Sequence, residues 1–156
     1  MNLLKVYKGN TSMWMNFKEA EAYDGENRGR DACVFLSLTP SSGGRSYDKE
    51  EAISLALNYW DITAILDGMD RGFLNSAGEK DGVGIVHKYD GVIKNLRIGC
   101  GEPDQKSGRL TYGWFLKVDQ KSYTIFTSEA ETFGGTNAKL GIYGYLLGCG
   151  QRMLQP

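Results

Sequence analysis

Apolar and polar residues alternate along most of this chain, and this period of two constrains the fold more than any other feature of the sequence. Between residues 13 and 22, Met13 and Phe17 fall on one face of an extended chain, and Trp14 falls on the other. Such a run packs as a strand with one side against a core and one side in water. We therefore expect a β-rich protein.

The alternating runs predict four strands and a helix, and then the same order again. The first strands are expected at residues 3–8, 13–22, 32–38 and 46–57, ahead of a short helix over 59–66. The second set is expected at 82–87, 92–98, 112–118 and 122–127, ahead of a final helix from 128 to 147. The prediction is an α+β fold of two antiparallel four-stranded sheets, each followed by a helix, in one domain over 1–156.

Local signals indicate where several of these elements begin and end. Pro40 and the glycines after it are expected to end the third strand, because proline cannot donate a hydrogen bond inside a central sheet. Asn58 is the expected N-cap of the first helix, and Gly68 is expected to stop that helix. Asp90 and Gly91, between two alternating runs, predict a tight hairpin.

The final helix has an unusual composition. Ser128 and Glu131 form a capping box at its expected start. Each glycine in its interior costs roughly 1 kcal/mol relative to alanine, so packing must hold the helix, although a kinked or broken helix is an open alternative. The residues expected to form an oligomer interface there are Phe133, Leu140, Gly141, Tyr143, Gly144 and Leu147. The tail over 149–156 is expected to be loosely ordered.

Composition excludes several classes of protein. The formal net charge is −1, which does not point to nucleic acid, yet a local basic face would suffice for such binding. Cys33, Cys100 and Cys149 are widely spaced and lack a Cys-x-x-Cys pair, which favours free thiols in a reducing compartment. No apolar run reaches the length of a membrane span, and the amino terminus does not resemble a secretory signal.

Catalytic chemistry is poorly represented, so we predict that the chain is not an enzyme and needs no cofactor or metal. His87 is the single histidine, which excludes a metal site built from several histidines. Carboxylates gather at residues 19–26 and 48–51, but they are mixed with basic residues and are typical of solvated surfaces. A hydrolase that uses these carboxylates with a divalent metal is a more distant hypothesis.

Three stretches resemble the whirly family of single-stranded-DNA-binding proteins and its shorter relatives, the transcriptional positive-coactivator family. The run from Pro40 to Asp48, with Arg45 and Tyr47, is similar to the family element Pro-Ala-Ala-Gly-x-Arg-x-Tyr-Asp. Tyr7-Lys8-Gly9 matches the start of the family's first-hairpin signature, although Asn10-Thr11-Ser12 replaces the remainder of that signature, including a second lysine. Leu146-Leu147-Gly148 matches the end of the family's last helix.

The resemblance implies two four-stranded sheets, helices that bury against a partner subunit, and an outer sheet face or edge that holds single-stranded DNA. It implies a homodimer or a higher homo-oligomer, with a role in transcription, replication or recombination and with partners from those processes. It implies little sequence specificity. The expected location is the cytoplasm or the nucleoid, or the host cytoplasm if the chain is encoded by a virus.

Binding of a single strand needs cations along the backbone and aromatic faces for the bases. The residues that could supply them are Lys5, Tyr7, Lys8, Trp14, Lys18, Phe35, Arg45, Tyr47, Lys49, Lys94, Arg97 and Lys117. Trp14, Phe35 and Tyr47 could instead cover the core or a sheet edge, and Trp60 and Trp114 are expected inside the core. The alternative function is a β-rich oligomeric interaction or structural module without nucleic-acid binding.

Overall fold

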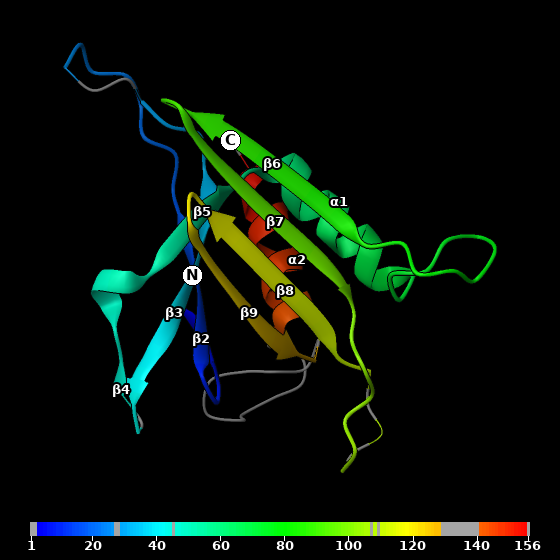
Figure 1. Ribbon diagram of the computed structural model, residues 1–156. Coiled ribbons are helices and arrows are strands. Elements are labelled where there is room, and N and C mark those ends of the chain that lie inside the picture. Colours follow the sequence, from blue (N-terminus) through cyan, green and yellow to red (C-terminus); the bar gives the residue numbers. More distant parts are fainter. Residues whose placement is uncertain are drawn as a thin grey trace.

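The computed structural model describes residues 3–26, 29–44, 46–106, 108, 110–128 and 141–155, which form two antiparallel sheets and two helices (Figure 1). The first sheet contains β1 (Leu4–Lys8), β2 (Thr11–Lys18), β3 (Cys33–Gly43), β4 (Ser46–Tyr47) and β5 (Ile53–Leu57). The second contains β6 (Val83–Tyr89), β7 (Val92–Cys100), β8 (Tyr112–Val118) and β9 (Lys121–Thr127). The helices are α1 (Tyr59–Asp70) and α2 (Ile142–Met153). The predicted fold class is confirmed.

Strand order shows how the two halves repeat one plan. The first sheet has the order β1-β2-β3, with β5 beside one end of β3 and the two-residue β4 beside its other end. The second sheet is a plain meander, β6-β7-β8-β9. In Figure 1 the second sheet lies in front, with both helices behind it, and α1 contacts α2, β6 and β5.

One core joins the two sheets and the helices. The inward-facing residues of β2 are the ones that the alternation predicts, since Met13, Met15 and Phe17 are buried. The largest side chains of this core with under 2% exposure include Trp114, Phe73, Leu36, Leu38, Leu55, Leu57, Ile62, Ile65, Leu96 and Ile98. Trp114 is inside, as predicted, and its indole nitrogen donates to the Thr127 hydroxyl over 2.7 Å.

The prediction for Trp60 is wrong, since this side chain is 75% exposed. Trp60 lies near the start of α1, and the buried residues Ile62, Ile65 and Met69 form a stripe on the opposite side of that helix. Apolar character in a helix-like run did not reveal which side faces the core.

Two strand boundaries in the first sheet also differ from expectation. The strand β3 continues through Pro40, which pairs with Thr11 at the very end of β2, where the missing N–H removes no central ladder bond. The expected strand over 46–57 is interrupted by a one-turn 3-10 helix, Lys49–Glu51. Asp48 causes the break, because its side chain accepts a hydrogen bond from the Glu50 amide and caps that turn.

The helix α1 begins as predicted and ends later. Asn58 and Asp61 form a reciprocal capping box, each side chain accepting from the other residue's amide over 2.9 Å. Gly68 does not stop the helix. The stop comes at Gly72, which has a φ of 60°, and the amides of Gly72 and Phe73 donate to the carbonyls of Met69 and Gly68 in a Schellman pattern.

The helix α2 begins at Ile142, with Gly141 as its N-cap residue, and runs to Met153. It therefore continues past the expected end at Leu147, and the prediction of a loosely ordered tail is wrong for residues 149–153. Glu131, and with it the predicted capping box, lies outside the described residues, as do Phe133 and Leu140.

Tyr145 ties α2 to the first sheet. Its hydroxyl donates to the Met15 carbonyl over 3.2 Å and accepts from the Phe17 amide over 3.0 Å. These backbone groups lie next to the start of β1, where Leu4 pairs with Met15. Burial raises the pKa of Tyr145, so the hydroxyl keeps its proton and can donate at neutral pH.

The second sheet follows its predicted boundaries closely, and the Asp90-Gly91 hairpin is confirmed. Both residues have positive φ, 52° and 79°, as a tight two-residue turn of the favoured hand requires. All three cysteines are free, and burial raises the pKa of the Cys149 thiol to about 11.

We predict that Gly68→Ala destabilises the protein, although alanine is the better helix former. A methyl group at this position would lie 2.7 Å from both the Phe73 ring and the Val83 side chain, and Phe73 is fully buried. Overpacking of about 1–3 kcal/mol exceeds the roughly 1 kcal/mol gain in helix propensity. Urea unfolding measures the difference. Gly84→Ala, where nothing lies within 4 Å, is the control and should be near neutral. Equal stability of Gly68→Ala and the parent would contradict the packing.

Replacement of Tyr145 by Phe should cost about 1–3 kcal/mol of unfolding free energy, because it removes both hydrogen bonds that the hydroxyl makes to the β2 backbone. The matched control is Tyr143→Phe. The Tyr143 hydroxyl donates to the exposed Asp70 carboxylate over 2.8 Å, and its removal should cost less unfolding free energy. Thermal and urea unfolding of both variants make the comparison. Similar losses for the two variants would show that the contact with β2 is not special.

Candidate nucleic-acid interface

The outward face of the first sheet carries an aromatic diagonal, formed by Phe35, Trp14 and Tyr7. Trp14 on β2 pairs with Lys5 of β1, while Tyr7 pairs with Ser12, two positions before Trp14. Phe35 of β3 pairs with Asn16, two positions after Trp14. The three rings therefore step diagonally across β3, β2 and β1, at about 7–8 Å per step.

Tyr47 adds a fourth ring next to Tyr7, although its strand β4 lies beside β3 and not beside β1. Its ring centroid lies 5.3 Å from that of Tyr7, and its hydroxyl donates to the Gly9 carbonyl over 3.3 Å. The short strand β4 positions Tyr47 for this contact, because it pairs with the end of β3 next to the β1–β2 turn. The predicted residues Tyr7 and Tyr47 are thus brought together.

Two ammonium groups lie at the centre of the aromatic diagonal. The Nζ atoms of Lys5 and Lys49 lie 4.4 and 5.4 Å from the ring centroid of Trp14, within the range of cation–π attraction. Lys49 reaches this place from the 3-10 turn that interrupts the expected strand over 46–57. The indole N–H of Trp14 is buried and has no hydrogen-bond partner among the described residues.

The other end of the aromatic diagonal is covered from within the chain. The guanidinium of Arg30 lies 5.9 Å from the Phe35 ring, and Arg30 also pairs with Glu21 over 3.3 Å at the base of the loop between β2 and β3. Burial raises the pKa of the neighbouring Cys33 thiol. Lys18, which pairs in register with Cys33, is exposed at this end. Sequence reasoning missed Arg30, which lies in a loop without alternation.

Four predicted residues, Lys8, Lys94, Arg97 and Lys117, do not join this group. The Lys8 side chain points to the opposite face of the sheet from Tyr7, because alternate residues of β1 point to opposite faces. Arg45 lies outside the described residues. Lys94 shares the inward parity of Leu96 and Ile98, so it is separated from Arg97, whose side chain points outward with that of Lys117.

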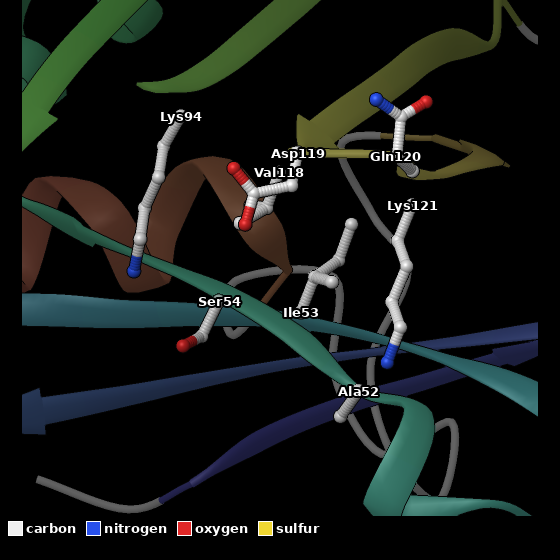
Figure 2. Close-up of a pocket in the computed structure, with 8 residues that line it drawn as sticks. All are labelled: Ala52, Ile53, Ser54, Lys94, Val118, Asp119, Gln120 and Lys121. Carbon is white, nitrogen blue, oxygen red and sulfur yellow. The ribbon is translucent and has the colours of Figure 1, made fainter. Parts of the chain in front are cut away.

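Lys94 lines a groove between the two sheets (Figure 2). Figure 2 shows the amino groups of Lys94 and Lys121 pointing from the second sheet toward β5, near Ser54 and Ala52. The Lys121 amino group lies 2.8 Å from the Glu51 carboxylate, and this hydrogen bond raises the pKa of Lys121. Asp119 also lines the groove, so its charges are mixed, and one of its two cations is already paired.

Charge is distributed unevenly over the first sheet. The outward positions of β1, β2 and β5, and of β3 as far as Thr39, hold two lysines and neither Asp nor Glu: Lys5, Tyr7, Ser12, Trp14, Asn16, Lys18, Cys33, Phe35, Ser37, Thr39, Ser54 and Ala56. Nearby carboxylates lie around it, on the 3-10 turn and its cap or in the loop, where Glu21 pairs with Arg30. The net charge of −1 thus conceals an outward face free of acids.

The residues considered for catalysis have structural contacts. His87 Nε2 lies 2.9 Å from the Asp61 carboxylate, and Asp61 also caps α1, so this pair joins β6 to the start of the helix. Within the part of the chain that the structure describes, no three His, Cys, Asp or Glu side chains gather as a metal site. Neither described helix has the length and apolar character needed to cross a bilayer.

The predicted oligomer residues that are described have mixed surroundings. Gly141 is buried within the chain, and Tyr143 bonds to Asp70 of α1. Leu147 is exposed on α2. Self-association through this helix stays a prediction.

Comparison with known proteins places the fold. No family model and no curated protein matches the sequence. Among solved structures, WHY3 from Arabidopsis thaliana matches with a TM-score of 0.60 and 12% identity, over 98% of this chain and 86% of that one. WHY1 from the same plant gives a TM-score of 0.60 and 17% identity, over 96% and 86%.

A third structure, that of the plant transcriptional regulator PBF-2, matches with a TM-score of 0.54 and 17% identity, over 95% of this chain and 77% of that one. At these identities the likeness establishes the fold alone. The chain has a whirly-like fold, as the sequence resemblance predicted.

Proposed function

We propose that this chain binds single-stranded DNA on the outward face of its first sheet, with little sequence specificity. The observation that carries the proposal is the aromatic diagonal, with the ammonium groups of Lys5 and Lys49 beside its central ring, Trp14. Cations that track a phosphate backbone beside aromatic rings that stack on bases are the two requirements of a single-strand site.

The geometry favours a single strand over a duplex. The bases of a duplex are stacked on one another, so their faces are not free to contact Trp14 or Tyr7, whereas an unpaired strand can turn its bases toward a sheet. Every base has a π-face, which accounts for low sequence specificity. Phosphates that draw Lys5 and Lys49 away from the Trp14 ring would open that ring for stacking and expose its N–H, which has no partner among the described residues.

The whirly-like fold supports a role in gene regulation, since the structure of PBF-2 is that of a plant transcriptional regulator. Roles in replication or recombination, with partners from those processes, belong to the same proposal. We also propose that the chain forms homo-oligomers through α2, where Leu147 is exposed. Light scattering of the purified protein would test this part independently of DNA. The expected location is the cytoplasm or the nucleoid.

Fluorescence anisotropy with a labelled oligothymidine should show Trp14→Ala binding about 5- to 150-fold more weakly than the parent, the equivalent of one lost stack of about 1–3 kcal/mol. Trp14→Phe should retain part of the affinity, because it keeps an aromatic face. The matched control is Trp60→Ala, an exposed tryptophan on α1, which should bind like the parent.

Circular dichroism and a melting curve would confirm that each variant is folded. Equal weakening by Trp14→Ala and Trp60→Ala would remove Trp14 from the site. A parent protein that binds no oligothymidine at low salt would overturn the proposed function and favour the interaction module.

A further inference from the structure

We propose that the outward face of the second sheet is a second single-strand surface, on which Phe115 and Phe126 stack on bases and Arg97 and Lys117 contact phosphates. This inference rests on the proposed function and extends it to residues outside the first sheet. Neither phenylalanine was recognised from the sequence as a binding residue. The strands β6–β9 that carry this surface are described completely.

The first observation is apolar exposure on a sheet face that points away from the core. Phe115 is 37% exposed and Phe126 is 56% exposed, and Val86 and Ile93 are exposed on the same face. The inward residues of these strands, such as Leu96 and Leu116, are fully buried, so the alternation itself places the phenylalanines outside. A cluster of exposed apolar side chains on one face is typical of a binding surface.

The second observation is the charge of that face. Its outward positions on β6–β9, all within the described part of the chain, contain three cations and no Asp or Glu: Gly84, Val86, Lys88, Ile93, Asn95, Arg97, Gly99, Gly113, Phe115, Lys117, Ser122, Thr124 and Phe126. Asp90 and Asp119 lie in the hairpin turns at the sheet's end. None of the chain's 19 acidic residues stands at these positions, so the face has a net positive charge.

The third observation is the strand register, which places Phe115, Phe126, Arg97 and Lys117 close together. Arg97 pairs directly with Phe115, and Lys117 follows Phe115 by two positions on the same face. Phe126 pairs with Gly113, two positions before Phe115, which makes the two rings diagonal neighbours at about 7–8 Å. The second sheet thus repeats the arrangement of the first, with diagonal aromatics beside cations.

Glycines shape this surface so that a flat ligand can approach it. The Phe126 ring lies against Gly113 and Gly101, where an added methyl group would come within 3.1 Å of the ring. One side of the ring is thereby supported by the protein, and much of the rest is exposed. Gly84 and Gly99 are also outward and have open space where a side chain would stand.

The positive charge of this face favours a polyanion as its ligand. A second copy of this face would bring Lys88, Arg97 and Lys117 against the same three cations, and such like-charge contact is unfavourable. A single strand instead neutralises the cations and stacks on the rings. Because both sheets bury their inner faces in one core, their outward faces point away from it, and a strand long enough to reach both gains affinity by linkage.

The test compares oligothymidines of about 8 and about 40 nucleotides on the full chain, the shorter one being within the range of a single site. The double variant Phe115→Ala, Phe126→Ala should bind the long strand about 5- to 150-fold more weakly for each stack lost, whereas Trp14→Ala should weaken both strands. Arg97→Ala with Lys117→Ala, at two exposed cations, should weaken the long strand without a risk to the core.

Tyr89→Ala is the matched control, because Tyr89 is 75% exposed at the tip of the β6–β7 hairpin and away from the proposed rings. Ultraviolet crosslinking of the long strand, followed by mass spectrometry, should yield adducts on the peptides that carry Phe115 or Phe126. If both double variants bind the long strand like the parent and no such adducts form, the proposal of a second surface is overturned and that of the first is left intact.

Two further results would also count against the second surface. A change of oligomeric state in the double variants with unchanged DNA affinity would assign the face to a second copy of the chain. Failure of the parent to bind either oligothymidine would instead overturn the proposed function itself, so the two failures are distinguishable.

Discussion

The structure depends on one constraint, which is that two sheets must share a single core. Each sheet can bury only one face, so strict alternation forces every second side chain outward. The inward side chains, from Met13 to Ile125, form one continuous cluster with the two helices. The outward side chains lie outside this cluster, and on both sheets they combine aromatic rings with lysine or arginine in the absence of carboxylates.

Small departures from regular structure place the rest of the first surface. Asp48 caps a 3-10 turn that interrupts the last strand, and this turn carries Lys49 to the Trp14 ring. The bulged end of β3 holds β4, from which Tyr47 reaches Tyr7.

Much of the fold could be predicted from the sequence, because period-two alternation and turn chemistry are local signals. The strand β8, the Asn58 cap and the Asp90-Gly91 hairpin follow directly from them. The errors arise where contacts between segments distant in sequence determine the local structure. Gly68 resembles a helix stop but is small to admit Phe73 and Val83, and the stop is at Gly72.

The candidate site was less accessible from the sequence for the same reason. Trp14, Tyr7 and Lys5 could be assigned to one face by parity, and their register agrees with that assignment. The cover of Phe35 by Arg30 depends on how a non-repetitive loop folds back, and no local signal encodes it. The expected burial of Trp114 already implied that Phe115 and Lys117 face outward, but no local signal marked this phenylalanine as a binding residue.

The central claim is that cationic, acid-free sheet faces bind the backbone of a single strand, and the salt dependence of affinity tests it most directly. The logarithm of the binding constant for oligothymidine should fall linearly with the logarithm of salt concentration. For a strand the slope is roughly −0.7 per phosphate neutralised, or about −2 if three lysines of the first surface engage. The slope should become shallower in Lys5→Ala with Lys49→Ala. An affinity independent of salt, or a slope unchanged by that double substitution, would contradict the account.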